Sequence, residues 1–343
     1  KHPDRDALVF PRLDPAGKPV AARHAQPDCF RLTWRQFDDE VDRVARALLG
    51  IGIEKGQHVA VWATNWPRWV LLQFATARIG AVQVTINPAY RAAELSYVLK
   101  QSDSKALFLT DQFRSSNYFQ ILHEAVPELA SSPPGQLGAP DYPKLRHVVS
   151  IKEHFEPGMW SWDEFSKTGG AVTDEEFAAR QAALSAGDAI NIQYTSGTTG
   201  FPKGAMLTHR NLLLNAYHIG DCQKITHEDR ICVPVPFYHC FGCVLGVLCC
   251  AVYGAAMVVP AEYFDPEQTL DAIETERATS LYGVPTMFIA QLEHETFSGR
   301  DLSSLRTGIM AGSPCPIEVM NRVVGDMGAE EVTIAYGLTE ASP

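Results

Sequence analysis

The residues best suited to chemistry lie in one segment, residues 194–204, which reads Tyr-Thr-Ser-Gly-Thr-Thr-Gly-Phe-Pro-Lys-Gly. Its hydroxyls, glycines and single lysine can surround a polyphosphate with backbone N–H groups, hydroxyl groups and one ammonium. The common phosphate loop places lysine directly after its second glycine and a magnesium-binding hydroxyl next. Here Phe201 and Pro202 intervene, and Gly204 follows Lys203. The segment therefore predicts a nucleotide-binding loop of another kind, with any metal held from elsewhere.

The flanking residues indicate how this loop is positioned. A strand-like run at 190–194 enters it, and a helix-like run at 208–220 follows. Glycine, serine and threonine clusters also form ordinary loops, which remains an alternative. A second polar segment, Tyr336-Gly337-Leu338-Thr339-Glu340, also follows a strand-like run. Open α/β sheets bind ligands beyond the carboxyl ends of their strands, so we expect both segments to face one crevice.

The rest of the chain alternates helical and strand-like patterns, which predicts an α/β fold with parallel sheets covered on both faces. A capping box at Thr33 to Gln36 predicts a helix that ends near Gly50. Other helices are expected at 67–79, 94–100, 265–276 and 317–327, and strands at 58–63, 81–86, 106–110, 280–284, up to 310, and 332–335. The Pro- and Gly-rich stretch 131–144 predicts an exposed connection between two α/β subdomains, 1–144 and 145–343.

The two polar segments together resemble the adenylate-forming superfamily, which comprises acyl-CoA synthetases, firefly luciferase and the adenylation domains of peptide synthetases. The likeness runs through nearly the whole chain. The phrase Met310-Ala311-Gly312-Ser313-Pro314-Cys315-Pro316 is most similar to medium-chain fatty acyl-CoA synthetases. The resemblance implies the family's large N-terminal domain with two parallel-sheet α/β subdomains. It also implies a reaction that joins a carboxylate to ATP, releases pyrophosphate and passes the acyl group to a thiol.

Residue roles follow from the same resemblance. It assigns catalysis to Lys203, His239, Thr339 and Glu340, with Glu340 binding Mg²⁺ and Thr339 donating to the α-phosphate. Tyr336 would stack on adenine beside a turn at Gly312 and Ser313. The β- and γ-phosphates would contact Thr195, Ser196, Gly197, Thr198, Thr199, Gly200 and Lys203. Each role has a plainer alternative. Lys203 could be a solvated surface lysine, Glu340 a solvent-facing glutamate and Tyr336 a core aromatic residue. The turn at Gly312 and Ser313 could be an ordinary turn.

The segment Phe237-Tyr238-His239-Cys240-Phe241-Gly242 bears on the substrate. Relatives that activate amino acids place an aspartate close behind the first aromatic residue, to pair with the substrate ammonium. This chain has Tyr238 and His239 there, the pattern of acyl-CoA synthetases and luciferase. We expect His239 near the carboxylate, although a structural histidine is the alternative. The apolar run 244–258 suggests a hydrophobic acyl pocket and fits an ordinary core equally well.

Composition limits the partners. The 343-residue chain is 46% hydrophobic and carries 29 Lys and Arg against 40 Asp and Glu, a net charge of −11. This acidic balance argues against a general nucleic-acid binder. The longest apolar stretch, 231–259, contains prolines and glycines. We therefore expect a buried strand, loop and helix there, and no transmembrane segment.

The eight cysteines lack the regular spacing of a secreted disulfide framework. We expect a reducing compartment, either the cytoplasm or, if a targeting segment has been removed, an organelle interior. Cys240 and Cys243 have the spacing of a metal half-site. No second such pair accompanies them, so we expect buried structural cysteines.

The sequence hypothesis is a fatty acyl-CoA synthetase that uses ATP, Mg²⁺ and coenzyme A. Its rivals are an aryl-acid CoA ligase and a non-catalytic nucleotide-binding module, and the oligomeric state stays open. Family members continue beyond the glutamate with a ribose-binding aspartate and a small mobile C-terminal domain that carries a lysine. The chain ends at Pro343. We therefore expect the small domain to be absent and the chain alone to have little or no activity.

Overall fold

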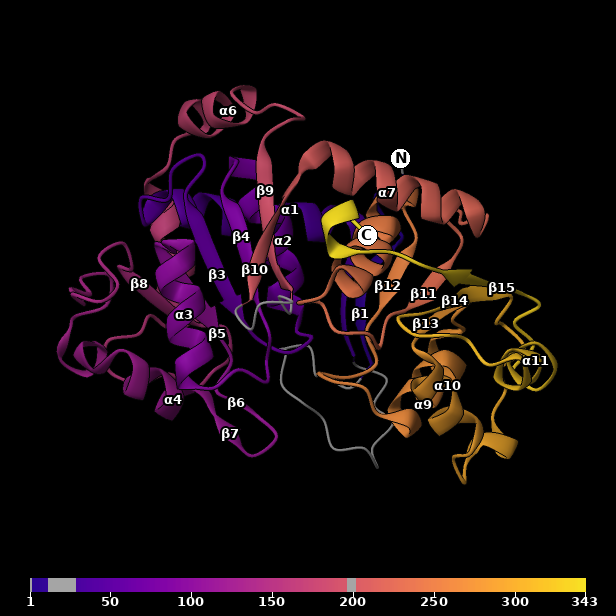
Figure 1. Cartoon of the computed structure of the whole chain (residues 1–343). Coiled ribbons are helices and arrows are strands. Elements are labelled where there is room, and N and C mark those ends of the chain that lie inside the picture. The colour runs from indigo at the N-terminus through magenta and orange to yellow at the C-terminus, as the bar shows by residue number, and fades with distance from the viewer. Residues whose placement is uncertain (1, 12–28, 196–201) are drawn as a thin grey trace. The chain divides into compact units, whose positions relative to one another are not determined.

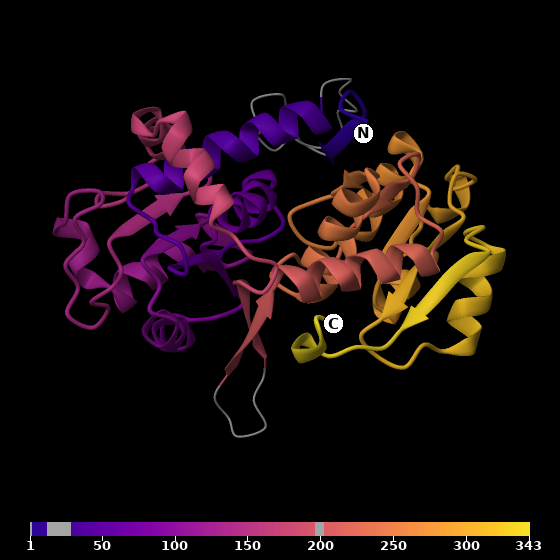
Figure 2. The same cartoon turned by 90° about the horizontal axis from the view of Figure 1, so that it is seen from above.

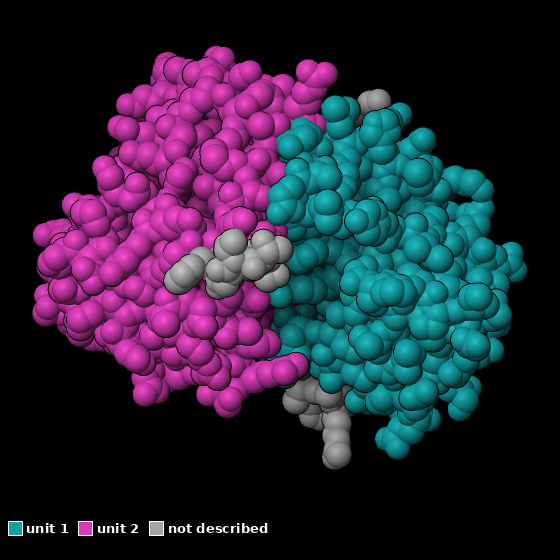
Figure 3. Space-filling view, in the orientation of Figure 1, with its two compact units in different colours: residues 1–38, 211–343 teal, residues 39–210 magenta. Residues whose placement is uncertain are grey.

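The computed structural model describes residues 2–11, 29–195 and 202–343 and shows an α/β fold built on parallel sheets (Figure 1). The chain forms two compact units, shown in different colours in Figure 3. Unit 1 comprises residues 1–38 and 211–343, and unit 2 comprises residues 39–210. The expected boundary at 144/145 differs from this division. Strands on either side of residue 144, β5 and β8, pair in one sheet, so the chain does not change units there.

Unit 2 contains a six-stranded sheet in the order β10-β9-β4-β3-β5-β8, which is parallel except for β10. Its strands are β3 (His58–Trp62), β4 (Val82–Ile86), β5 (Ala106–Leu109), β8 (His147–Ser150), β9 (Ala189–Thr195) and β10 (Lys203–Thr208). Its helices are α2 (Pro67–Ile79), α3 (Ala92–Ser102), α4 (Tyr118–Ala125), α5 (Trp162–Lys167) and α6 (Asp174–Ala182), and β6 (Gln112–Phe113) and β7 (Ser116–Asn117) form a small hairpin. Strands β4 and β5 are buried along their whole length, as expected of parallel strands covered on both faces.

Unit 1 contains a seven-stranded sheet in the order β15-β14-β13-β11-β12-β1-β2, in which only the edge strand β2 is antiparallel. Its strands are β1 (Asp6–Phe10), β2 (Phe30–Thr33), β11 (Arg230–Cys232), β12 (Ala256–Val258), β13 (Ser280–Gly283), β14 (Thr307–Ala311) and β15 (Glu331–Ala335). Its helices are η3 (Phe241–Leu248), α8 (Cys249–Tyr253), α9 (Pro266–Glu276), α10 (Pro285–Leu292) and α11 (Ile317–Gly325). Two further helices, α1 (Trp34–Gly50) and α7 (His209–Cys222), contain the residues at which the chain passes between units.

Local signals in the sequence set several helix ends. At the start of α1 the Thr33 backbone N–H donates to the Gln36 side chain at 2.9 Å, and the Gln36 N–H donates to the Thr33 hydroxyl, as the capping box predicts. Helix α9 begins where the Asp265 carboxylate accepts from the Gln268 N–H at 2.8 Å. Helix α2 ends at Gly80, whose φ of 70° suits a left-handed C-cap.

Two stretches differ in detail from expectation. The connection at 131–144 has no helix or strand beyond the end of a short 3₁₀ turn, but it is not wholly exposed, because Leu137, Ala139 and Tyr142 are buried in the core of unit 2. The apolar stretch 231–259 folds as strand, loop and helix as expected, although its first helix, η3, is a π-helix with all eight residues buried. Within the residues that the structure describes, no helix is long and apolar enough to cross a bilayer.

Candidate functional site

In unit 2 the ends of the candidate nucleotide loop are held by a β-hairpin. Lys203 in β10 is the cross-strand partner of Thr195 in β9, and the Thr195 hydroxyl lies 3.5 Å from the Lys203 carbonyl. The hairpin extends from the sheet as a long two-stranded ribbon (Figure 2). Lys203 is exposed, as a phosphate-binding lysine must be before its ligand arrives. Ser196, Gly197, Thr198, Thr199 and Gly200 lie outside the described residues.

Aromatic side chains lie at the loop end of this hairpin. Tyr97 in α3 donates its hydroxyl to the Pro202 carbonyl at 3.1 Å, directly before Lys203. Tyr194 is half-buried at the other end of the loop. Burial, with Tyr97 and Tyr90 nearby, raises the pKa of Tyr194 well above its usual range. Tyr97 was not recognised in the sequence, because nothing in its spacing marks a contact with a loop about a hundred positions later.

In unit 1 the expected adenine-binding residues come together at the carboxyl edge of the sheet. Strands β14 and β15 are parallel neighbours whose last residues, Ala311 and Ala335, are directly paired. Gly312 and Tyr336 each follow one of these residues, so the turn at Gly312 and Ser313 lies beside Tyr336. The φ of Gly312 is 88°, a left-handed value that favours glycine at this turn. Tyr336 is 92% exposed, which excludes a core aromatic and leaves its ring open to a planar ligand.

The segment after Tyr336 folds back on itself and places Thr339 and Glu340. A short 3₁₀ turn, η5 (Thr339–Ala341), follows, and Ser342 adopts a left-handed φ of 84° while fully buried. The Asn215 side chain in α7 donates to the Pro343 carbonyl, and both views of the fold show this segment beside α7 (Figures 1 and 2). Glu340 is exposed and Thr339 is half-buried.

The loop between β11 and η3 presents His239 at the same carboxyl edge. The Gly242 N–H donates to the His239 carbonyl at 2.9 Å, and a Cβ on Gly242 would overlap the Pro236 carbonyl, so only glycine allows this tight turn. The Phe241 N–H donates to His239 Nδ1 at 3.1 Å. This contact requires an unprotonated Nδ1, so the neutral ring carries its proton on Nε2. His239 keeps an exposed surface, yet burial of its ring by surrounding atoms lowers its pKa.

Cys240 connects this loop to the segment that carries Thr339. Its Sγ lies 3.6 Å from His239 Nδ1 and 3.7 Å from Thr339 Oγ1. Burial raises the pKa of Cys240, hydrogen bonds oppose that rise, and the charge of Glu340 adds to it. The structure thus brings His239 and Thr339 together around Cys240, and Glu340 directly follows Thr339 in the chain. The sequence indicated a buried structural cysteine and missed this contact, which joins residues 99 positions apart.

A divalent cation fits this part of unit 1 only with help from a ligand. Among residues 2–11, 29–195 and 202–343, no group of three or more His, Cys, Asp or Glu side chains is placed to hold a metal. Glu340, which directly follows Thr339, is an exposed carboxylate. Mg²⁺ is commonly bound by one or two carboxylates, several waters and substrate phosphates. The donor set therefore fits a magnesium ion that arrives with a nucleotide.

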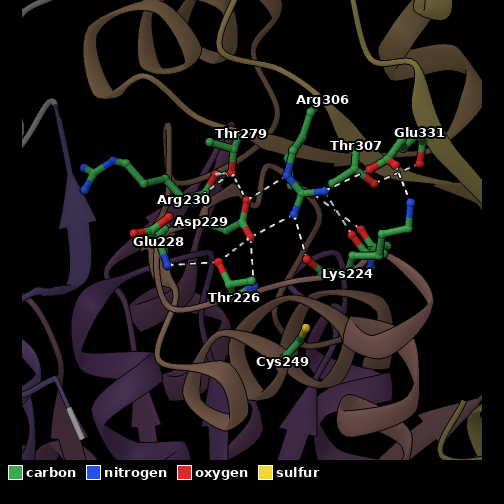
Figure 4. Close-up of polar contacts among 12 residues, drawn as sticks. Lys224, Thr226, Glu228, Asp229, Arg230, Cys249, Thr279, Arg306, Thr307 and Glu331 are labelled. Atoms are coloured by element: carbon green, nitrogen blue, oxygen red, sulfur yellow. Dashed lines mark hydrogen bonds and ion pairs between the residues drawn. The ribbon is translucent and has the colours of Figure 1, made fainter.

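The opposite, amino-terminal edge of the unit 1 sheet is held by charged side chains. Figure 4 shows the Arg306 guanidinium between Asp229 and Glu331. Arg306 precedes β14, Asp229 precedes β11 and Glu331 begins β15, so the cluster ties three strands together at the edge away from the site. Burial would raise the pKa of Asp229, but hydrogen bonds from Arg306 and Thr279 outweigh it and lower that pKa.

Comparisons with known proteins agree with this fold. A family model described as AMP-binding enzyme matches residues 1–343. The chain is 50% identical over 342 residues to the putative acyl-CoA synthetase YngI of Bacillus subtilis, covering 100% of this chain and 59% of the relative. It is 40% identical over 347 residues to the human mitochondrial medium-chain acyl-CoA ligase ACSF2, covering 99% of this chain and 54% of the relative. The chain thus spans a little over half the length of these curated relatives.

Two solved structures show the same fold. One is the anthranilate CoA ligase AuaEII in complex with anthranoyl-AMP, with a TM-score of 0.79 and 24% identity over 99% of this chain and 58% of that chain. The other is the N-terminal domain of FACL13 from Mycobacterium tuberculosis, with a TM-score of 0.75 and 23% identity over 99% of this chain and 74% of that chain.

Proposed function

From the premise that the chain belongs to the AMP-binding enzyme family, we propose that its protein activates a fatty acid with ATP. The reaction forms an acyl adenylate with release of pyrophosphate, and coenzyme A then displaces AMP to give a thioester. The carrying observation is the contact of one sulfur, that of Cys240, with both His239 and Thr339. Through this sulfur, His239, which is expected at the substrate carboxylate, lies close to Thr339, which is expected at the α-phosphate.

Each proposed role rests on the geometry of its own unit. A carboxylate and a triphosphate repel each other, so the site must neutralise charge and align the carboxylate with the α-phosphorus. In unit 1, Tyr336 would stack on adenine above the turn at Gly312, and Thr339 would donate to the α-phosphate. Glu340 would hold Mg²⁺, which supplies charge neutralisation on the phosphate oxygens.

In unit 2, Lys203 and Thr195 would bind the β- and γ-phosphates of the same ATP. Their pairing across the hairpin supports this role, because it presents an ammonium and a hydroxyl at the two ends of one loop. A phosphate oxygen between them would receive a charge-assisted hydrogen bond from the lysine. Ser196, Gly197, Thr198, Thr199 and Gly200 complete the proposed phosphate-binding set.

The histidine loop supports a fatty acid as the substrate. With Nδ1 occupied by the Phe241 N–H, His239 offers a neutral Nε2–H donor to a carboxylate oxygen. Tyr238 and His239 stand where an acidic partner for an amino-acid ammonium would be required. The following helix, η3, contributes only apolar and glycine side chains apart from Cys243. The similar proteins described as medium-chain acyl-CoA ligases favour a medium-chain substrate.

The test is ATP–pyrophosphate exchange by the full-length protein with a series of carboxylic acids. We expect exchange to be greatest with unbranched alkyl acids of medium length and to require Mg²⁺. Thioester formation should follow only when coenzyme A is added. A greater response to ring carboxylates would replace the proposal with an aryl-acid CoA ligase. Nucleotide binding without exchange for any acid would indicate a non-catalytic module.

A further inference from the structure

The Cys240 thiol lies between two polar groups of the proposed site and is itself hidden from solvent. Cys240 is 1% exposed, so it cannot touch a substrate directly. Its Sγ is 3.6 Å from His239 Nδ1 and 3.7 Å from Thr339 Oγ1, both within hydrogen-bonding range for sulfur. Any effect of Cys240 on the reaction must therefore pass through these two neighbours.

The hydrogen bonds around the thiol restrict where its single proton can go. His239 Nδ1 already accepts from the Phe241 N–H at 3.1 Å, so this nitrogen carries no proton and cannot donate to sulfur. In one arrangement the thiol accepts the Thr339 proton and points its own proton toward His239 Nδ1, whose single lone pair it must share with the Phe241 N–H. In the other arrangement the thiol donates to Thr339 Oγ1, and the threonine proton points elsewhere. The two arrangements differ only by rotation of one S–H and one O–H bond.

Resting on the proposed function, we propose that Cys240 is a positioning residue that donates to Thr339 Oγ1 and so directs the threonine proton toward the α-phosphate oxygen. The rotation gives up the shared contact with Nδ1 and the threonine donation to sulfur, and it forms the thiol bond to Thr339 Oγ1 while freeing the threonine proton for the α-phosphate oxygen. A threonine hydroxyl without this neighbour is free to rotate and is less often aligned for donation. The thiol thus pre-orders the hydroxyl without bearing charge, in keeping with its burial.

A purely structural cysteine would not show this contact pattern. Cys232 offers the comparison within the same chain, since its thiol is also buried, at 0% exposure. It ends strand β11 and packs in the hydrophobic core of unit 1 with Leu281 and Phe288. Cys232 is therefore the control for loss of a buried thiol.

The experiment measures kcat and KM for ATP–pyrophosphate exchange in full-length protein carrying Cys240→Ala, Cys240→Ser or Cys232→Ala. We expect Cys240→Ala to lower kcat about fivefold, the loss of one modest hydrogen bond, while KM for ATP and for the acid changes less than twofold. Cys240→Ser should restore kcat to within about twofold of wild type, because serine keeps a donor and an acceptor. Cys232→Ala should keep wild-type kcat. In a Thr339→Val background, Cys240→Ala should have no further effect.

The outcomes separate this inference from the proposed function. If wild type is active and Cys240→Ala keeps its kcat, or loses no more than Cys232→Ala, the positioning role is wrong and the proposed function stands. If Cys240→Ala and Cys240→Ser lose kcat equally and their thermal midpoints fall equally, the loss reflects destabilisation, and the positioning role is again wrong. If wild type shows no exchange with any carboxylate, the proposed function and the role of Cys240 fall together.

Discussion

Replacement of Arg306 by methionine should destabilise unit 1 selectively. Methionine keeps the unbranched chain and removes the guanidinium, which donates to Asp229 at 3.1 and 2.8 Å. The same guanidinium donates to the carbonyls of Gln223 and Lys224 and to Glu331 at 3.0 to 3.1 Å. The change therefore leaves a buried carboxylate and two carbonyls without their cationic partner (Figure 4).

The size of the effect follows from burial. Breaking a buried ion pair by removing one partner costs about 3–5 kcal/mol. Asp229 is 5% exposed, but the Arg306 side chain is 34% exposed, and the Thr279 hydroxyl still donates to the carboxylate at 2.7 Å. Solvent screening and this remaining donor reduce the expected loss of unfolding free energy to about 2–3 kcal/mol. With a urea dependence of roughly 2 kcal/mol per molar, the midpoint of unit 1 should fall by about 1–1.5 M.

The chain contains separate reporters for its two units. All eight cysteines lie within 1–38 and 211–343, and five of them are buried, so pulsed thiol labelling in urea follows unit 1. Most of the six tryptophans lie in unit 2, so fluorescence follows mainly that unit: Trp62, Trp66, Trp69, Trp160 and Trp162. Arg306→Met should shift the labelling midpoint and leave the fluorescence midpoint in place. Arg35→Met, which breaks an exposed pair with Asp4 in the same unit, is the control and should shift neither midpoint by more than about 0.3 M.

The pH dependence of the stability loss in Arg306→Met tests the reasoning more sharply than its size at pH 7. In wild type, folding lowers the pKa of Asp229. Ionised Asp229 therefore stabilises the folded state at pH values above the ordinary pKa of an aspartate, and this stabilisation is lost as pH falls through the folded pKa. Without the guanidinium, the folded pKa of Asp229 is higher than in wild type, because the lowering contributions of Arg306 are lost while those of Thr279 and Thr226 remain. The variant therefore loses less stability with acid than wild type does, and its deficit in unfolding free energy should narrow from pH 7 toward pH 4. A deficit that widens with acid, or no deficit at pH 7, would refute the reasoning.

Three further predictions concern unit 2 and the proposed site. Burial, and then the charges of Lys105 and Arg146, lower the pKa of His147 to about 4. The stability linked to neutral His147 is therefore fully present above pH 6.5 and is lost as pH falls toward 4. His147→Gln should remove up to roughly 3 kcal/mol of this dependence, measured by tryptophan fluorescence in urea across pH, and an unchanged pH profile would contradict it. Tyr97→Phe removes the bond to the Pro202 carbonyl and should raise KM for ATP about three- to tenfold in full-length protein; an unchanged KM would exclude this supporting role. Glu340→Gln should lower exchange activity about a hundredfold or more, with partial recovery as Mg²⁺ is raised, whereas a wild-type rate would remove Glu340 from the proposed metal site.

Periodicity predicted much of the fold because the relevant signals are local. The range of α2 was predicted to the residue at 67–79, and the capping box at Thr33 marked the start of α1. The strand β10 was missed, because its glycine-containing run is largely exposed and lacks the apolar character of a buried strand. The buried Leu137, Ala139 and Tyr142 were missed for a related reason, since proline and glycine indicate irregular backbone but not its burial.

In the candidate site, too, features with a local sequence signal were predicted and contacts between distant segments were not. Segments that follow strands were recognised from their residue types, and the pairing of Ala311 with Ala335 then brings Gly312 beside Tyr336. The contacts of Cys240 with Thr339 and of Tyr97 with Pro202 could not be anticipated, because each depends on the three-dimensional path of distant segments. The predicted meeting of the loop before Lys203 with Glu340 around one ATP stays a prediction.

The assembly of unit 1 from two distant stretches of chain has a consequence during synthesis on the ribosome. Strand β1 pairs with β12 through Leu8 and Met257, so its partner emerges 249 residues later. At about 5–20 residues per second, β1 waits roughly 12–50 s for this partner. All of unit 2 is translated within that interval, and it can fold while β1 has only β2 to pair with and its other edge still lacks β12. An apolar Ala-Leu-Val-Phe run left waiting in this way is a natural target for chaperones, and slower translation would lengthen its exposure.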